Sequence, residues 1–247
     1  FQRPDSKLSV DSLATSMTGT RIGASIGKTG GGITRFNSNV TTSSAGFDVN
    51  DAGFLTRADV TNNGNWFALQ FQQPTKFFVN LNQWNDWNTD GLHLNSGGNI
   101  NINGELPNQW WFWAGYNVNG LGEAFDDRAS RGGPALRRNL RSNGWLGFET
   151  DQRRTVRVAL QGYYVLKDVS GSTEWGIDPS LSFRVASRLQ TQIGLHLSAG
   201  AFDQQWYGNS TDASGTHYTF ARLDQRTTSL TTRIDYTMTD PKMWKGE

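Results

Sequence analysis

The most regular feature of the chain is an alternation of apolar and polar side chains along segments of nine residues or more. In the segment 174–185, every second residue from Trp175 to Val185 is apolar, and the residues between them are polar or glycine. A similar alternation, with threonine at some of the apolar positions, covers 189–200 and 228–238. Because successive side chains of a strand point to opposite faces, these segments predict long strands with one apolar and one polar face.

Weaker forms of the alternation extend this pattern over most of the sequence. They lie at 22–26, 36–40, 67–71, 77–81, 99–105, 110–118 and 156–164. The last hairpin is expected to run from Leu189 to Trp206, turn near 209–215 and return from His217 to Met238. The count is eleven strands, or twelve if Asp224–Gln225 forms a turn. Soluble strands usually have about five or six residues, whereas a tilted membrane-spanning strand needs about 9–11.

The links between these segments form a second pattern, in which short and long links alternate. Short links are expected at 28–32, 73–75, 106–108, 151–153 and 186–187, and longer ones at 42–64, 85–98, 119–143 and 167–172. Strict alternation of this kind is typical of a barrel with tight turns at one end and long loops at the other. We therefore predict an all-β fold, an antiparallel transmembrane β-barrel of the outer-membrane type that occupies 1–247 as a single domain.

Closure of such a barrel is expected to need more strands than this sequence supplies. Single-chain bacterial barrels usually have an even number of strands, and the ending 242–247 lacks the aromatic-terminated final strand expected of them. We therefore expect 1–247 to be part of a larger barrel. The start at Phe1 shows no signal peptide, so export to the outer membrane implies a signal removed from this end.

Composition supports an envelope β-protein and argues against other classes. Only 36% of the 247 residues are hydrophobic and the mean hydropathy is −0.57, so no run approaches the roughly 18 apolar residues of a membrane-spanning helix. Ten Trp and fourteen Phe are too many for a disordered polar chain. A net charge of +1 gives no electrostatic basis for binding nucleic acid, and the absence of Cys excludes a disulfide scaffold or a thiolate metal site.

The link 119–143 is the first candidate for a functional element. A loop of about 25 residues without a pattern of its own is often functional or folded inward. One hypothesis places it in the lumen as a plug or gate, paired with wall charges such as Arg157, Glu174 and Arg184. The alternatives are an extracellular loop held by its own Arg–carboxylate pairs, and catalysis. Its charged candidates are Glu123, Asp126, Asp127, Arg128, Arg131, Arg137 and Arg138.

The polar face of the predicted strands supplies the candidate lumen wall. Balanced charges on this face are typical of a water-filled or loop-filled interior rather than of a strongly ion-selective pore. Outward aromatic residues near strand ends are expected to form girdles that anchor the barrel at both interfaces. The wall candidates are Arg157, Glu174, Asp178, Arg184, His196, Arg233 and Asp235, and the girdle candidates are Trp175, Tyr164, Tyr236, Phe71 and Phe77.

No arrangement of residues predicts catalysis, a metal site or a cofactor. The three His residues are too dispersed for a metal site, and His196 is expected to be a hydrogen-bonded wall residue. The segment 48–53 fails as a calcium loop at Ala52, where an oxygen ligand is needed, and turn chemistry explains it better. Asp126 and Asp127 are adjacent and would point apart, whereas a retaining glycosidase needs two carboxyls about 5 Å apart.

Several motifs in the links resemble a known bacterial family of unassigned activity. The run 126–138 (DDRASRGGPALRR) resembles the family's hallmark, and 3–5, 46–55 and 215–225 resemble further motifs in the family's order. Members join an N-terminal module similar to family-9 carbohydrate-binding domains to a C-terminal outer-membrane β-barrel. The resemblance covers most of 1–240 and implies an upstream module and final strands outside this chain. Glycan binding is not carried over to any residue, because that module is absent here, and no catalytic residue is transferred.

Taken together, these patterns predict a non-enzymatic protein of the bacterial outer membrane, with the lipid bilayer as its main partner. It is expected to act as a channel, transporter or docking platform. A protein partner in an envelope complex and a glycan ligand are further expectations, whereas nucleic acid is not expected. Two alternatives stay open: a membrane-embedded glycan hydrolase, and a soluble carbohydrate-binding β-sandwich that uses Trp and Asn residues.

Overall fold

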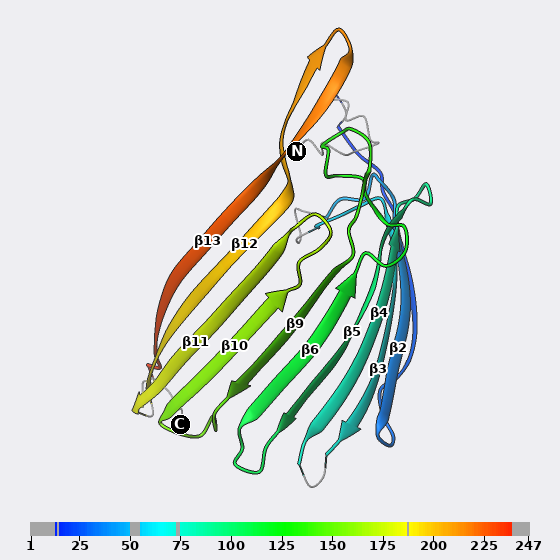
Figure 1. Ribbon diagram of the computed structural model, residues 1–247. Helices are drawn as coiled ribbons and strands as arrows, with labels where there is room; N and C mark the ends of the chain where they lie inside the picture. The colour runs from blue at the N-terminus through cyan, green and yellow to red at the C-terminus, as the bar shows by residue number, and fades with distance from the viewer. Residues whose placement is uncertain (1–12, 14, 50–54, 73–74, 187, 239–247) are drawn as a thin grey trace.

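The protein forms a single antiparallel sheet in which each long strand lies beside the next long strand of the sequence (Figure 1). The computed structural model describes residues 13, 15–49, 55–72, 75–186 and 188–238. These residues contain no helix, and their eleven long strands confirm the predicted all-β antiparallel fold. The long strands are β1 (Arg21–Lys28), β2 (Thr34–Ser43), β3 (Val60–Phe71), β4 (Phe77–Trp87), β5 (His93–Glu105), β6 (Trp111–Asn119), β9 (Arg141–Glu149), β10 (Val156–Val165), β11 (Thr173–Ala186), β12 (Leu189–Asp212) and β13 (Gly215–Tyr236).

The last two strands form a hairpin that extends past the upper ends of the others (Figure 1). β12 has 24 residues and β13 has 22, in agreement with the long alternation in this part of the sequence. Asp224 and Gln225 lie inside β13, so the long strands number eleven and not twelve.

The links at the lower end of Figure 1 are tight, as predicted, but the strict alternation of short and long links is wrong. The expected long link 85–98 reduces to 88–92, because β4 and β5 continue through an amide- and glycine-rich stretch that shows no apolar alternation. Asn88 closes this link, since its Oδ1 accepts hydrogen bonds from the backbone N–H of Asp90 and Leu92 over 3.1 and 2.9 Å. The link 42–64 is likewise shorter than expected and spans 44–59.

The described residues form an open, curved sheet rather than a closed cylinder (Figure 1). β1 and β13 are its two edges, and they are not paired with each other. Among the described residues, long strands contact other long strands only as neighbours in the sheet, so no second layer of long strands packs against either face. This arrangement contradicts the β-sandwich alternative, in which the apolar rows of two sheets would interdigitate.

The two faces of the sheet separate apolar from polar side chains. Side chains from distant strands, including Asn143 and Phe202, line one cavity on the polar face, so that face is concave. Large apolar side chains on the convex face are exposed instead of being buried in a core. They include Ile22, Ile26, Phe36, Phe67, Leu81, Ile100, Leu146, Val158, Ile193, Leu230 and Ile234.

Aromatic side chains lie near both ends of this convex apolar band, at the positions expected for girdles. Tyr164 and Trp175 are paired across β10 and β11 near the upper end and are 50% and 44% exposed. Near the lower end, Phe71 and Phe77 flank the β3–β4 link with ring centroids 6.2 Å apart, and Tyr236 ends β13. From Val156 to Tyr164, the band on β10 covers about 27 Å along the strand.

The apolar band is interrupted on the upper half of β2–β5, where the convex face is polar. Ser38 Oγ donates to Asn65 Oδ1 over 2.7 Å, and Asn65 Nδ2 donates to Gln83 Oε1 over 2.6 Å. Ser38, Asn65 and Gln83 lie in register with one another on the adjacent strands β2, β3 and β4. The convex face is therefore apolar over a longer stretch on β10–β12 than on β3–β5.

Few side chains of the described residues are fully buried, and most of these lie at the upper end. The buried apolar residues are Ala58, Val60, Ala68, Leu94, Ala124, Val165 and Ala201. Among the residues described, no helix has the length and apolar character needed to cross a membrane. The fold therefore depends on the backbone hydrogen bonds of the sheet more than on a packed interior.

Tryptophan side chains on the concave face lie over glycines of neighbouring strands. Trp113 on β6 faces Gly147 on β9, and Trp145 on β9 faces Gly115 on β6 in the next row, so the two pairs are reciprocal. A Cβ atom at Gly147 would lie 2.5 Å from Cε2 and Cζ2 of Trp113, and one at Gly115 would overlap the Trp145 ring. The glycines are thus required for the rings to lie flat against the wall.

This packing makes Gly147 intolerant of a side chain. We expect Gly147→Ala to lower the free energy of unfolding by about 1–3 kcal/mol through overpacking. Gly144→Ala on the same strand is the control, because its Cβ would meet nothing closer than Gly115 O at 3.7 Å. The measurement is thermal or urea unfolding followed by circular dichroism, and equal stability of the two variants would contradict the packing described.

Candidate functional site

The link between β6 and β9 (residues 120–140, the mouth loop) folds over the concave side at the upper end of the sheet (Figure 1). It contains a small hairpin of β7 (Phe125–Asp126) and β8 (Leu136–Arg137), a regular element that the sequence did not predict. Asp126 Oδ1 accepts a hydrogen bond from the backbone N–H of Arg128 over 3.0 Å, and Ser130 Oγ donates to Pro134 O over 2.9 Å. Local hydrogen bonds therefore give the loop a defined shape.

An ion pair fixes the mouth loop to the link between β2 and β3. Arg57 Nη2 lies 2.6 Å from Asp127 Oδ2, and the two side chains are only 19% and 18% exposed. Burial alone would raise the pKa of Asp127, but the hydrogen bond and charge of Arg57 outweigh it, with help from Asn88 and Arg128. The pKa therefore lies below its ordinary value, and the carboxylate is charged at neutral pH.

A second set of contacts fixes the turn of the mouth loop to the β12–β13 hairpin. The guanidinium Cζ of Arg131 lies 4.2 Å from the centroid of the Trp206 ring, which is a cation–π geometry. Gly133 lies so close to the Tyr218 ring that a Cβ atom there would overlap it. Because Arg57 and Trp206 belong to opposite parts of the sheet, the mouth loop bridges the upper end of the concave side.

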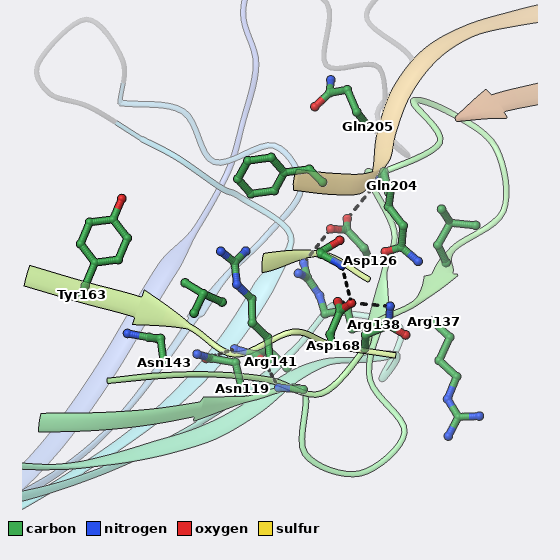
Figure 2. A pocket seen from close by; sticks show the side chains of 18 residues that line it. Asn119, Asp126, Arg137, Arg138, Arg141, Asn143, Tyr163, Asp168, Gln204 and Gln205 are labelled. Carbon is green, nitrogen blue, oxygen red and sulfur yellow. Dashed lines mark hydrogen bonds and ion pairs between the residues drawn. The ribbon is translucent and has the colours of Figure 1, made fainter. Parts of the chain in front are cut away.

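Two cavities lie on the concave side beside the mouth loop. The larger, of about 650 Å³, reaches from Asn143 and Tyr163 on the sheet to Gln204 on β12 (Figure 2). The smaller, of about 470 Å³, is lined mainly by β2–β5 and the link that follows β2. Arg138 lines both cavities and is held by an ion pair to Asp126 at 2.9 Å. The mouth loop thus divides the entrance to the concave side into two openings.

Arginine side chains outnumber carboxylates around the two cavities. Asp168 remains charged there: burial would raise its pKa, but hydrogen bonds from Ser170, Ser172 and Asn139 hold it below the ordinary value. The charged residues that line one or both cavities are Arg21, Arg57, Arg137, Arg138, Arg141, Asp86, Asp126 and Asp168. Arg57, Arg138 and Arg141 are each paired with a carboxylate, of Asp127, Asp126 and Glu174 respectively, so these charges of the upper entrance are balanced.

Of the wall charges predicted to pair with the link 119–143, Glu174 does so through Arg141, the first residue of β9, whereas Arg157 does not. Arg157 pairs with Glu149 at 3.6 Å, and Glu174 pairs with Arg141 at 3.0 Å, so both find partners on strands of the sheet. Arg184 lies near the lower end of β11, which is the end of the sheet away from the mouth loop. Cross-strand neighbours neutralise the wall charges, which leaves the mouth loop to pair within itself and with Arg57.

The other predicted residues are divided between the entrance and the wall. Glu123 and Arg137 are exposed in the mouth loop. On the wall, His196 Nδ1 lies 2.5 Å from Asp178 Oδ1 and its Nε2 lies 3.1 Å from Ser198 Oγ. Arg233 and Asp235 form an ion pair at 2.8 Å near the lower end of β13. The structure therefore joins the mouth-loop residues into one unit but does not bring these wall charges to it.

The concave face below the mouth loop carries an uncharged area, here called the neutral wall. It consists of three consecutive rows of side chains across β3, β4, β5, β6, β9 and β10. Nine of its eighteen residues are Asn or Gln, and none is Asp, Glu, Lys or Arg. The upper row is Trp66, Asn82, Asn99, Asn117, Asn143 and Val165, the middle row Ala68, Asn80, Asn101, Gly115, Trp145 and Tyr163, and the lower row Gln70, Phe78, Asn103, Trp113, Gly147 and Gln161.

Hydrogen bonds between side chains fix the orientation of groups on this wall. Asn80 Nδ2 donates to Asn101 Oδ1 over 3.0 Å, and Asn82 Nδ2 donates to Asn99 Oδ1 over 2.8 Å. The indole N–H of Trp66 donates to Asn80 Oδ1 over 3.0 Å. The amides and rings are thus held by one another across adjacent strands, with their remaining hydrogen-bonding capacity directed at the concave space.

The described residues contain no group of three or more His, Cys, Asp or Glu that could hold a metal ion. His93 contacts Glu123 O and Ser96 Oγ through its two ring nitrogens, at 2.9 and 2.7 Å. Three features of the sequence lie outside the described part: the motif 3–5, residues 50–53 of the calcium-like segment, and the ending 242–247.

Sequence reasoning missed the partners that position the mouth loop. Arg57 is 70 residues from Asp127 in the sequence, and the local pattern of neither link predicts that the two residues form an ion pair. The same holds for Trp206 and Tyr218, which were assigned only to a long hairpin. The reciprocal rings did leave a signal, because Trp-x-Gly occurs at 113–115 and again at 145–147. On antiparallel neighbours in register, that repeat places each Trp opposite a Gly.

Comparisons with known proteins give a family and a distant structural likeness. The family described as "Domain of unknown function (DUF5916)" matches residues 4–244. No curated protein sequence matches the chain. Among solved structures, the beta domain of the Bordetella autotransporter BrkA is similar at 15% identity and a TM-score of 0.24, over 89% of this chain and 90% of that one.

The lowered pKa of Asp127 makes attachment of the mouth loop dependent on pH. The contribution of the Arg57–Asp127 pair is complete above the ordinary pKa of 3.8 and is lost as pH falls through the lowered value. We expect Asp127→Asn to remove about 1–2 kcal/mol from local attachment, which raises exposure of the loop by about 5- to 30-fold at neutral pH.

Hydrogen exchange of residues 120–140, corrected for intrinsic rates, measures this effect. In the wild type, protection of the loop should decrease as the pH is lowered past about 4. In Asp127→Asn, protection should vary little over the same pH range. Asp151→Asn is the control, since Asp151 is bound by Arg153 in the tight link after β9, at the other end of the sheet. Equal protection in Asp127→Asn and wild type would contradict the anchoring role.

Proposed function

The chain belongs to the DUF5916 family, and we propose that its sheet forms the wall of an outer-membrane β-barrel that conducts polar solutes. In this proposal the convex face contacts lipid, and the concave face lines a water-filled passage. The mouth loop narrows the upper entrance of that passage. The family description names no activity, so the proposal is argued from the two faces of the sheet.

The exposure of large apolar side chains along the convex face carries this proposal. Full burial of a Val, Leu, Ile or Phe side chain is worth about 1.5–3 kcal/mol, so a whole face of such residues in water is strongly unfavourable. Hydrocarbon removes that cost, and aromatic side chains at both ends of the band suit the two interfaces. The stretch of about 27 Å on β10 matches a tilted strand that crosses a bilayer.

The concave face supports a passage for polar solutes rather than a sealed interior. Its side chains are mostly amides, hydroxyls, glycines and paired charges, as an aqueous lumen requires, together with aromatic rings such as those of Trp113 and Trp145. The wall charges are balanced by cross-strand partners such as Glu149 with Arg157 and Glu174 with Arg141. A solute in the lumen would therefore meet hydrogen-bonding groups and few uncompensated charges.

The mouth loop supports control of entry. It is held at two places, by Arg57 on one side and by Trp206 on the other, and the cavities pass beside it. Movement of this loop would merge two openings into one, whereas its attached position restricts the passage. This arrangement favours a channel or transporter over a plain docking platform.

Lipid contact is tested with a pair of substitutions on neighbouring residues of β12. Ile193 lies on the convex face and Gln192 on the concave face. We expect Ile193→Arg to destabilise the protein in phospholipid vesicles by about 2–4 kcal/mol, because arginine would lie in hydrocarbon. Gln192→Arg should change stability by less than about 1 kcal/mol. Equal effects in urea unfolding, or a wild type that is stable without detergent or lipid, would refute the membrane assignment.

Control of entry is tested by conductance in planar bilayers. We expect Asp127→Ala combined with Arg131→Ala to raise single-channel conductance, because the variant loses both fixed points of the mouth loop. Asp151→Ala, in the tight link at the opposite end, should conduct like the wild type. A double variant that conducts like the wild type would reduce the mouth loop to a structural link, and the absence of any wild-type conductance would reject the channel.

A further inference from the structure

We propose that the neutral wall binds uncharged oligosaccharides, with sugar rings stacked on its flat aromatic side chains and sugar hydroxyls bound by its amides. This inference deepens the proposed function, because it names the class of solute that the passage would recognise.

The aromatic rings of the concave face are held flat in a way that leaves one side free. The Trp113 indole crosses Gly147 and donates its N–H to Gln161 Oε1, two strands away, over 3.1 Å. One side of the ring therefore rests on the glycine backbone, and the other side is turned to the concave space. The ring is therefore already ordered before a ligand binds, which reduces the side-chain conformational entropy lost on binding.

The same device occurs a second time, just above the neutral wall. Trp84 crosses Gly97 and donates its N–H to Asn119 Oδ1 on the strand beyond, over 3.2 Å. A Cβ atom at Gly97 would lie 2.8 Å from Cε2 of Trp84, so this ring too lies flat against the sheet. Repetition of ring, glycine and amide on different strands gives two separated platforms of the same kind.

The amides of the neutral wall select for hydroxyl groups. Each Asn or Gln offers both a donor and an acceptor, and a sugar hydroxyl needs both. The chain of bonds from Asn80 through Asn101 and Asn99 to Asn82 orients these groups across β4 and β5. Because the eighteen positions carry no charge, they provide no counter-ion for an anionic or cationic ligand.

A pyranose ring matches this combination of surfaces. Its axial C–H groups carry partial positive charge and suit the negative face of an aromatic ring, while its equatorial hydroxyls point sideways to hydrogen-bonding groups. The rings and amides of the neutral wall lie side by side on one face in the same way. Asn143 and Tyr163 belong both to this wall and to the larger cavity, so the entrance leads directly onto it.

Because the Trp rings pack on glycines, a substitution of Trp can change stability as well as ligand binding. The test therefore measures binding of the wild type first. Protein purified in detergent is titrated calorimetrically with maltohexaose and with cellohexaose, and with fully sulfated maltohexaose as the charged control. We expect wild type to bind at least one neutral hexasaccharide and to bind the sulfated one at least about tenfold more weakly. Failure of wild type to bind either neutral hexasaccharide would overturn the proposal, whatever the variants do.

The matched variants are Trp113→Leu on the concave face and Trp110→Leu on the convex face, where the ring stacks on Phe148 with centroids 5.6 Å apart. We expect Trp113→Leu to weaken binding by at least about tenfold and Trp110→Leu to leave it unchanged. Trp113→Phe keeps a ring over Gly147 and should give an intermediate affinity in a stable protein. Wild-type affinity in folded Trp113→Leu would show that the ring only fills space, and would overturn the proposal.

The titration in detergent is independent of the membrane tests of Ile193→Arg and of conductance. Oligosaccharide binding without conductance would leave the neutral wall as a sugar site and reject the channel. Conductance without oligosaccharide binding would retain the channel and reject the sugar site. The two proposals therefore fail separately.

Discussion

The in-register pairing of neighbouring strands is the constraint on which the other features of this protein depend. Because the side-chain period of a strand is two, a slip of one residue would move every apolar side chain of that strand to the polar face. The register is continuous from Trp66 on β3 to Val165 on β10, and it places one member of each row on every strand between them. The exposed convex band, the amide rows and the crossed rings are three products of that single alignment.

The sequence contained enough information for the fold but not for the entrance. Alternation over 174–185, 189–200 and 228–238 predicts the strands correctly because an apolar and a polar face impose period two over many residues. The pattern fails at 85–98, where β4 and β5 continue with Asn, Ser and Gly on both faces and only the backbone pairing marks the strand. The anchors of the mouth loop could not be predicted, since Arg57 meets Asp127 only after the sheet has curved and brought separate links together.

Glycine has an unusual part in this sheet, where it would ordinarily weaken a strand. On the concave face, Gly97, Gly115 and Gly147 are the positions over which indole rings lie, and side chains there would displace the rings. The loss of local strand propensity is offset by ring contact and, for Trp84 and Trp113, by hydrogen bonds from the indole to an amide two strands away. Glycines that interrupt the alternation therefore make room for the indole rings. The repeat Trp-x-Gly at 113–115 and 145–147 is the sequence pattern that corresponds to this packing.

The concave side is uncharged over three rows from β3 to β10, whereas Arg35 on β2 and Glu174 and Asp178 on β11 continue those rows on the flanking strands. At the upper rim Arg57, Arg138 and Arg141 lie in ion pairs with carboxylates, and other charges such as Glu105 and Glu149 lie below the uncharged rows. The uncharged rows are therefore bordered by charged groups above them, below them and on the two flanking strands. In the proposed passage, selection by charge and selection by shape would therefore use different parts of the wall, and each could change through substitution without disturbing the other.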